Sequence, residues 1–298
     1  MKEIVVLSGK GGTGKTSLTA SFAQLIQESI ICDADVDAAD LHLLTAPTIQ
    51  ERNAFIGGSK ALIEKERCTS CGRCRELCRF DAIDDTFAVD SFSCEGCGVC
   101  VDLCPENAIA FPEQQCGEWY VSATRFGTMI HARLGAGEEN SGRLVSLVRQ
   151  QARERAEAAG KQMILTDGPP GIGCPVIASL GGASAAVIVV EPTLSGMHDM
   201  ERVVGLARHF RVPTCVCVNK YDINEEITAQ IEAFANAQNC QFLGRIAYDT
   251  IFVQAMIAGK NILEYEPDGR SAVSIYQIWE NLMKSEHMKR KSLHVLPT

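Results

Sequence analysis

The stretch EIVVLSGKGGTGKTSL (residues 3–18) decides the fold of this 298-residue chain. A short apolar run, EIVVL, leads directly into the glycine-rich segment GKGGTGKT, which fits the pattern GxxxxGK[ST]. In this pattern, glycines let backbone N–H groups turn toward phosphate oxygens, and the N-terminus of the next helix favours their negative charge. Lys15 is placed to reach the β- and γ-phosphates, and Thr16 to ligate Mg²⁺. The stretch therefore predicts a strand, a nucleotide-phosphate loop and a helix.

Short β-branched runs alternate with helical stretches along most of the chain. The expected strands are EIVVL, SIIC before Asp33, QMILT before Asp167, AAVIVV before Glu191 and PTCVCV before Asn219. Helices are expected over 17–26, 143–159 and 199–209. Continuous apolar runs suit strands that are buried on both faces. The pattern predicts an α/β fold with a doubly wound, mostly parallel sheet of the P-loop NTPase kind, with ligands bound at the carboxyl ends of the strands.

Composition narrows the classes of partner. The formal net charge of −9 argues against nucleic-acid binding, which needs a basic surface that displaces phosphate counterions. The N-terminus lacks the features of a secretory signal, and no apolar run approaches the roughly 18 residues of a membrane span, so we expect a cytoplasmic protein without stable membrane insertion. Cytosolic thiols stay reduced, so the 14 cysteines favour metal ligation over disulfides.

Lys10 adds a second lysine to the loop, in KGGTGKT (residues 10–16). This stretch resembles the deviant Walker A motif of the MinD, ParA, Mrp and nitrogenase iron protein superfamily. The resemblance implies a nucleotide-sandwiched dimer, of two identical chains or of two paralogues, in which Lys10 reaches phosphate across the dimer. It also implies that Asp35 in DADVDAAD lies in switch I and positions the attacking water, and that Asp167 in ILTDGPPG is the Walker B aspartate, coordinating Mg²⁺ through water.

These motifs together define an expected ATPase site. The expected catalytic residues are Lys10, Lys15, Asp35 and Asp167, with Mg²⁺ on Thr16 and Asp35. The expected nucleotide contacts are Gly11, Gly12, Thr13, Gly14, Lys15, Thr16, Ser17, Asn219 and Asp222. Asn219 ends a strand in VNKYD, where its amide is placed to read the base. Asp222 completes an NKxD pattern that favours guanine, whereas the family resemblance implies ATP.

The composition changes abruptly between about Gly57 and Pro112. This segment carries eight cysteines in two runs, CTSCGRCRELCRFDAI (68–83) and CEGCGVCVDLCPENAI (94–109), which repeat after about 26 residues. We expect residues 57–112 to form a small α+β domain inserted into an ATPase domain made of residues 1–56 and 113–298. Its own core is too small to be stable without metal.

Both runs resemble the cysteine motifs of bacterial two-cluster ferredoxins. In that family, three cysteines of one run ligate one 4Fe–4S cluster and the fourth ligates the other. The resemblance implies one cluster on Cys68, Cys71, Cys74 and Cys104, and a second on Cys94, Cys97, Cys100 and Cys78. A zinc site would favour separated CxxC pairs. The sequence departs from the ferredoxin pattern at Arg79, where proline is expected after the fourth cysteine.

Cys174 lies seven residues after Asp167. In the nitrogenase iron protein a cysteine similarly follows the Walker B segment and helps to hold a cluster between subunits, so Cys174 is either an additional ligand or a small buried thiol. Cys215 and Cys217 alternate along an expected buried strand and are interpreted as core residues.

Three functions are compatible with these motifs. The preferred one is ATP-gated electron transfer from two 4Fe–4S clusters to a redox partner. The alternative is an ATPase that assists assembly or delivery of a metal–sulfur cofactor to an acceptor protein. A MinD-like positioning ATPase ranks third, because SEHMKRKSLHVLPT (285–298) has no sustained apolar stripe of the kind that an amphipathic membrane helix needs.

Overall fold

A nine-stranded sheet organises the computed structural model, which describes residues 1–26, 29–135, 138 and 140–289. In sheet order the strands are β11 (Gln241–Ile246), β10 (Thr214–Asn219), β9 (Ala185–Val190), β1 (Lys2–Ser8), β8 (Met163–Pro170), β2 (Ser29–Asp33), β7 (Gly127–Leu134), β6 (Glu113–Thr124) and β3 (Thr48–Ser59). The strands from β11 to β7 are parallel, and β6 and β3 extend the sheet by antiparallel pairing. The predicted mostly parallel α/β sheet is confirmed.

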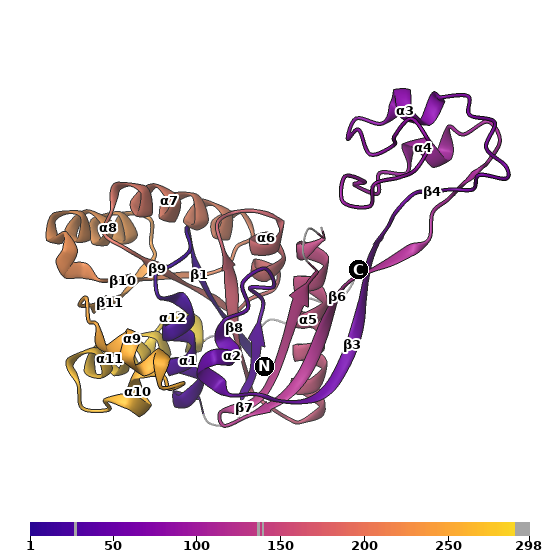
Figure 1. Cartoon of the computed structure of the whole chain (residues 1–298). Helices are drawn as coiled ribbons and strands as arrows, with labels where there is room; N and C mark the ends of the chain where they lie inside the picture. The colour runs from indigo at the N-terminus through magenta and orange to yellow at the C-terminus, as the bar shows by residue number, and fades with distance from the viewer. Residues whose placement is uncertain (27–28, 136–137, 139, 290–298) are drawn as a thin grey trace.

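Helices cover both faces of this sheet (Figure 1). One face carries α5 (Ser141–Ala158), α6 (Cys174–Leu180), α7 (Leu194–His209) and α8 (Glu225–Ala237). The other carries α1 (Lys15–Leu25), α2 (Leu41–Thr45), α9 (Ile251–Ile257), α10 (Ile262–Tyr265), α11 (Arg270–Lys284) and α12 (Glu286–Lys289), and a 3₁₀ turn spans Tyr221–Ile223. Among the described helices, none is both long and apolar enough to cross a bilayer.

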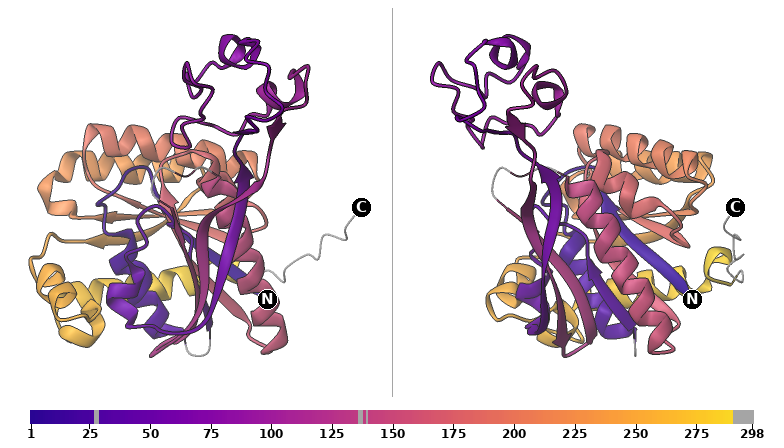
Figure 2. Two further views of the ribbon diagram at one scale, coloured as in Figure 1. Left: turned by 45° about the vertical axis from the view of Figure 1, so that its right-hand side comes forward. Right: turned by 90° about the vertical axis from the view of Figure 1, so that its right-hand side faces the viewer.

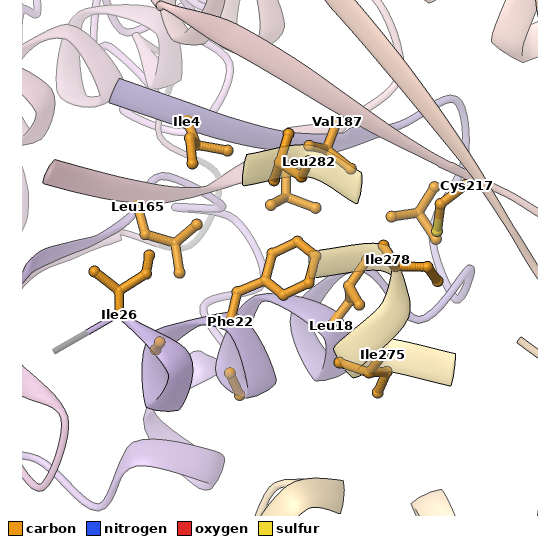
Figure 3. Close-up of a cluster of buried hydrophobic side chains, with 14 of the residues drawn as sticks. Ile4, Leu18, Phe22, Ile26, Leu165, Val187, Cys217, Ile275, Ile278 and Leu282 are labelled. Carbon is orange, nitrogen blue, oxygen red and sulfur yellow. The ribbon is translucent and has the colours of Figure 1, made fainter. Parts of the chain in front are cut away.

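The central strands are held between two apolar layers. Every residue of β9 and β10 is buried, which explains why their sequences read as continuous apolar runs. Figure 3 shows Phe22 of α1 between the strand residues Leu165 and Val187 and the α11 residue Ile278. This packing holds α1 against the sheet and α11, and so fixes the position of the loop between β1 and α1.

Strands β3 and β6 form a ribbon that runs past the rest of the sheet. Pairing between β6 and β7 stops at Gly117 and Leu134, whereas β6 and β3 stay paired as far as Glu113 and Ser59. The four residues 113–116 therefore overshoot the sheet by about 13 Å at roughly 3.3 Å per residue. Because β3 runs in the same direction as β2, the ribbon projects beyond the carboxyl edge of the parallel strands.

Residues 60–112 form a separate small body at the tip of this ribbon (Figure 2). It contains β4 (Leu62–Ile63) paired with β5 (Ile109–Ala110), and two one-turn helices, α3 (Arg73–Leu77) and α4 (Val99–Asp102). The apolar core of this body consists of Ala61, Ile63, Ile83 and Ile109, with six cysteines packed against it. Such a small core depends on further stabilisation.

Candidate functional site

The loop between β1 and α1 lines a cavity at the carboxyl edge of the sheet. Gly12 and Gly14 have positive φ values of 77° and 90°, which glycine adopts without strain. The cavity gathers most of the expected nucleotide contacts: its lining includes Gly11, Gly12, Thr13, Gly14, Lys15, Thr16, Ser17 and Asp35, together with Leu43, Leu44, Pro170 and Met256. The geometry of this loop suits binding of a polyphosphate.

Lys15 lies between two of the expected catalytic carboxylates. Its Nζ is 3.2 Å from Asp35 Oδ2 and 3.2 Å from Asp167 Oδ1, and its side chain is buried. Burial opposes the charge on Lys15, but the carboxylates of Asp167 and Asp35 outweigh this effect and raise its pKa. Burial raises the pKa of Asp35, and Lys15 partly offsets that increase. Lys15 is thus held as a cation beside the loop.

Two hydroxyl groups of α1 contact the same aspartate. Thr16 Oγ1 donates to Asp167 Oδ2 at 2.7 Å, and Thr19 Oγ1 donates to Asp167 Oδ1 at 2.9 Å. A hydroxyl beside carboxylates is the type of oxygen ligand that Mg²⁺ prefers. The structure therefore brings together Thr16, Asp35 and Asp167, the three residues expected to hold Mg²⁺ directly or through water.

Asp33 is a third carboxylate in this cluster, at the carboxyl end of β2. Its Oδ1 accepts from the backbone N–H of Asp35 at 3.2 Å, and its Oδ2 has no hydrogen-bond partner among the described residues. Burial, together with the nearby charge of Asp167, raises the pKa of Asp33 well above its ordinary value. The carboxyl groups of Asp33, Asp35 and Asp167 thus all lie near one lysine, Lys15.

In this structure the side chain of Lys10 contacts residues of its own subunit. Its Nζ lies 3.1 Å from Glu191 Oε2 and 3.4 Å from Thr193 Oγ1. Lys220 donates to the other oxygen of Glu191 and, at 3.3 Å, to the backbone oxygen of Gly12. Glu191 and Lys220 were not among the expected site residues, although each directly follows an expected strand, and that position is the signal that identifies them.

Asn219, the last residue of β10, contacts the phosphate loop between β1 and α1. Its Nδ2 donates to the backbone oxygen of Thr13 at 2.8 Å, and its Oδ1 accepts from the N–H of Lys220 at 3.0 Å. Asp222 Oδ1 accepts from the N–H of Tyr248 at 2.6 Å. In this structure Asn219 therefore supports the loop and Asp222 fixes the segment after β11, whereas their contacts with a base stay predictions.

The eight clustered cysteines line two cavities of the small body. One cavity is lined by Cys68, Cys71, Cys74 and Cys104, and the other by Cys78, Cys94, Cys97 and Cys100. Each set combines three cysteines of one run with the fourth of the other, as the ferredoxin resemblance implies. Gly72 and Gly98, at matching places in the two runs, have φ values of 81° and 75° and are the N-cap residues directly before α3 and α4. The sequence repeat is thus also a repeat of backbone geometry.

The other cysteines lie elsewhere. Cys174 is exposed at the start of α6 and lines a cleft with Asp37, Trp119 and Arg143, apart from the two cysteine cavities. Its interpretation as a buried thiol is wrong, and its role as a cluster ligand stays a prediction. Cys215 and Cys217 are buried within β10, so their assignment to the core is confirmed.

A family comparison accounts for the loop and the sheet together. Residues 4–262 match the profile of the family described as "CobQ/CobB/MinD/ParA nucleotide binding domain". The chain belongs to this family. Membership in the CobQ/CobB/MinD/ParA family confirms the MinD and ParA part of the predicted resemblance and makes the chain a nucleotide-binding, MinD/ParA-like P-loop ATPase.

Relatives of this family cover nearly the whole chain. "Uncharacterized protein MJ0578" of Methanocaldococcus jannaschii is 30% identical over 287 residues, which cover 94% of this chain and 96% of the relative. The cell division ATPase MinD of Pyrococcus furiosus has a similar structure, with a TM-score of 0.59, 16% identity and coverage of 95% and 98%. MinD of Pyrococcus horikoshii, solved with Mg-ADP, has a TM-score of 0.58 and 16% identity, and the match covers 98% of this chain and 99% of that protein. These two structures support the fold of the family domain.

Proposed function

We propose that this MinD/ParA-like ATPase carries two 4Fe–4S clusters, and that ATP binding and hydrolysis in a dimer control electron transfer from them to a partner protein. One observation carries the proposal: the eight cysteines of the small body line two separate cavities, four to each, in the crossed sets that are typical of two-cluster ferredoxins. When bound, 4Fe–4S clusters supply one-electron transfer. We assign this redox function to an inserted domain spanning residues 57–112.

Clusters rather than single metal ions are proposed for the cysteine cavities. Among residues 1–26, 29–135, 138 and 140–289, no three His, Cys, Asp or Glu side chains lie close enough to hold one ion. A tetrahedral zinc site would draw four sulfurs to about 2.3 Å from one centre. Each iron of a 4Fe–4S cube instead takes one thiolate, which spaces the sulfurs more widely. Six of the eight cysteines also pack on the core of the small body, so metal binding would stabilise that core.

Backbone hydrogen bonds link the segment that follows Asp35 to the base of the ribbon. Val36, the residue after Asp35, accepts from the N–H of Leu134 at 3.3 Å. Gly135, which follows Leu134, donates its N–H to the backbone oxygen of Cys116 in β6 at 2.7 Å. A change in the Asp35 segment on binding of a γ-phosphate would therefore act directly on the ribbon.

A lysine joins the ribbon, the small body and the sheet. Lys60 Nζ donates to the backbone oxygen of Ser91 at 2.7 Å and pairs with Glu138 Oε1 at 3.1 Å. Lys60 follows the last residue of β3, Ser91 lies in the small body, and Glu138 lies between β7 and α5. These contacts support coupling between the nucleotide state and the position of the cysteine cavities.

The nucleotide is proposed to be ATP with Mg²⁺, and the active form a dimer with Lys10 in contact with the partner's nucleotide. The Mg-ADP complex of the P. horikoshii MinD supports an adenine nucleotide. The engagement of Asp222 with Tyr248 weakens the alternative of guanine recognition.

The positioning function that the sequence ranks third has the strongest support among the comparisons, because several solved relatives are MinD proteins. Residues 290–298, which form most of the C-terminal segment used against it, lie outside the described residues. A positioning function would not explain the two cysteine cavities. Delivery of a metal–sulfur cofactor would use them, and is the second candidate for that reason.

Incubation with an acceptor distinguishes these functions. The cluster-loaded chain is mixed anaerobically with an apo two-cluster ferredoxin, with and without ATP, and the iron in each protein is measured after separation. Electron transfer predicts that the iron stays with the chain under both conditions. ATP-dependent transfer of iron to the ferredoxin would instead establish delivery. ATP-dependent sedimentation with anionic phospholipid vesicles, run on the same sample, would favour positioning.

A further inference from the structure

Glu191 lies between two lysines at the edge of the nucleotide site. It is the first residue after β9, and its side chain is only 15% exposed. One carboxylate oxygen pairs with Lys10 at 3.1 Å and the other pairs with Lys220. Burial disfavours the charge on Glu191, but its hydrogen bonds to Lys220 and Lys10 outweigh this effect and lower its pKa. The carboxylate is therefore charged at neutral pH and attracts both lysines.

The two lysines differ in how firmly they are held. Lys220 also donates to the backbone oxygen of Gly12, and its own N–H donates to Asn219, so it is tied to the loop and to β10. Among the described residues, the Lys10 side chain has one further hydrogen bond, to Thr193 at 3.4 Å, and it is one-third exposed. Its backbone is fixed separately, because Ser8 Oγ donates to its carbonyl oxygen at 2.8 Å. The Lys10 side chain can therefore leave while Lys220 continues to neutralise Glu191.

We propose that Glu191 is a positioning residue that retains Lys10 within its own subunit and so weakens nucleotide-bound dimerisation, with Lys220 setting how strongly Lys10 is held. The inference rests on the proposed dimer, in which Lys10 must turn away from its own subunit to reach the partner's nucleotide. Each subunit has to break one partly buried ion pair before the dimer closes. Lys220 shares the carboxylate and so reduces its hold on Lys10.

Two substitutions are expected to change dimerisation in opposite directions. Glu191→Gln releases Lys10 and should lower the protein concentration for half-dimerisation about tenfold, since a modest ion-pair energy is saved in each subunit. Within the part of the chain that the structure describes, Lys220→Met leaves Lys10 as the one ion-pair partner of Glu191, and this substitution should raise that concentration by roughly the same factor. Sedimentation velocity of the full chain with a non-hydrolysable ATP analogue measures both effects.

The double variant separates this role from a structural one. If Lys220 acts through Glu191, Lys220→Met should have little effect in the Glu191→Gln background, whereas a purely structural role at Gly12 would persist there. Glu201→Gln on the exposed side of α7 is the matched control and should dimerise like the wild type. If the wild type dimerises and Glu191→Gln does not differ from it, the inference about Glu191 is wrong. If neither protein dimerises at any concentration, the proposed dimer fails and the inference fails with it.

Discussion

Replacement of Lys15 by alanine should reduce ATP hydrolysis about 100- to 1000-fold, the loss typical for removal of one group that stabilises transition-state charge. Lys15 is the buried cation between Asp35 and Asp167, 3.2 Å from an oxygen of each. Without it, the phosphates would face uncompensated carboxylates and lose the contact expected at their β- and γ-oxygens. Phosphate release at saturating ATP and Mg²⁺ measures the effect.

Two comparisons make the Lys15 result specific. Lys260→Ala removes an exposed lysine that does not line the cavity of the phosphate loop, and this variant should hydrolyse ATP at the wild-type rate. The iron content of Lys15→Ala should equal that of the wild type, because the cysteine cavities lie in the separate body at the tip of the ribbon. A Lys15→Ala protein that keeps more than about a tenth of the activity would exclude this loop as the hydrolytic site.

Substitution of single cysteines should remove iron in steps of one cluster. We expect about eight iron atoms in the wild-type chain and about four in Cys71→Ser, Cys104→Ser or Cys97→Ser. Cys71 and Cys104 line the same cavity although they belong to different runs, so the variant lacking both should still keep about four. Cys97 lines the other cavity, and the variant lacking Cys97 and Cys104 should lose nearly all the iron.

The two double variants test the crossed arrangement directly. If each run held its own cluster, the Cys97/Cys104 variant would keep about four iron atoms and the Cys71/Cys104 variant would lose them all. Cys240→Ser is a suitable control, because Cys240 is buried near the end of α8 and outside both cavities. Iron is determined after anaerobic purification, and ATP hydrolysis by each variant shows that the ATPase domain is folded.

The parallel core and the phosphate loop were predictable because their signals are local. Strands such as β9 are buried on both faces and so read as unbroken apolar runs, and the glycine loop has a spacing that few other structures need. The two cysteine sets followed instead from the resemblance to two-cluster ferredoxins, in which the fourth cysteine of each run belongs with the other run. The predicted fold and the gathering of Lys15, Thr16, Asp35 and Asp167 therefore follow from short stretches of sequence.

The ribbon and the contacts of Lys10 could not be predicted in this way. β3 (TIQERNAFIGGS) is a mostly exposed edge strand with no continuous apolar run, and its pairing with β6 joins residues more than 50 positions apart. The ion pair of Lys10 with Glu191 requires the ends of two neighbouring strands to meet, which only the order of the sheet establishes. Such long-range pairings depend on the whole fold rather than on any one segment.

If the state of the nucleotide controls the clusters, as proposed, their reduction potentials should depend on which nucleotide is bound. Potentials are measured by anaerobic redox titration of the cluster-loaded chain without nucleotide, with Mg-ADP and with a non-hydrolysable Mg-ATP analogue. We expect the analogue to shift at least one cluster by about 60 mV or more, which corresponds to a tenfold change in a one-electron equilibrium. Identical potentials in all three states would show that the nucleotide does not control the clusters.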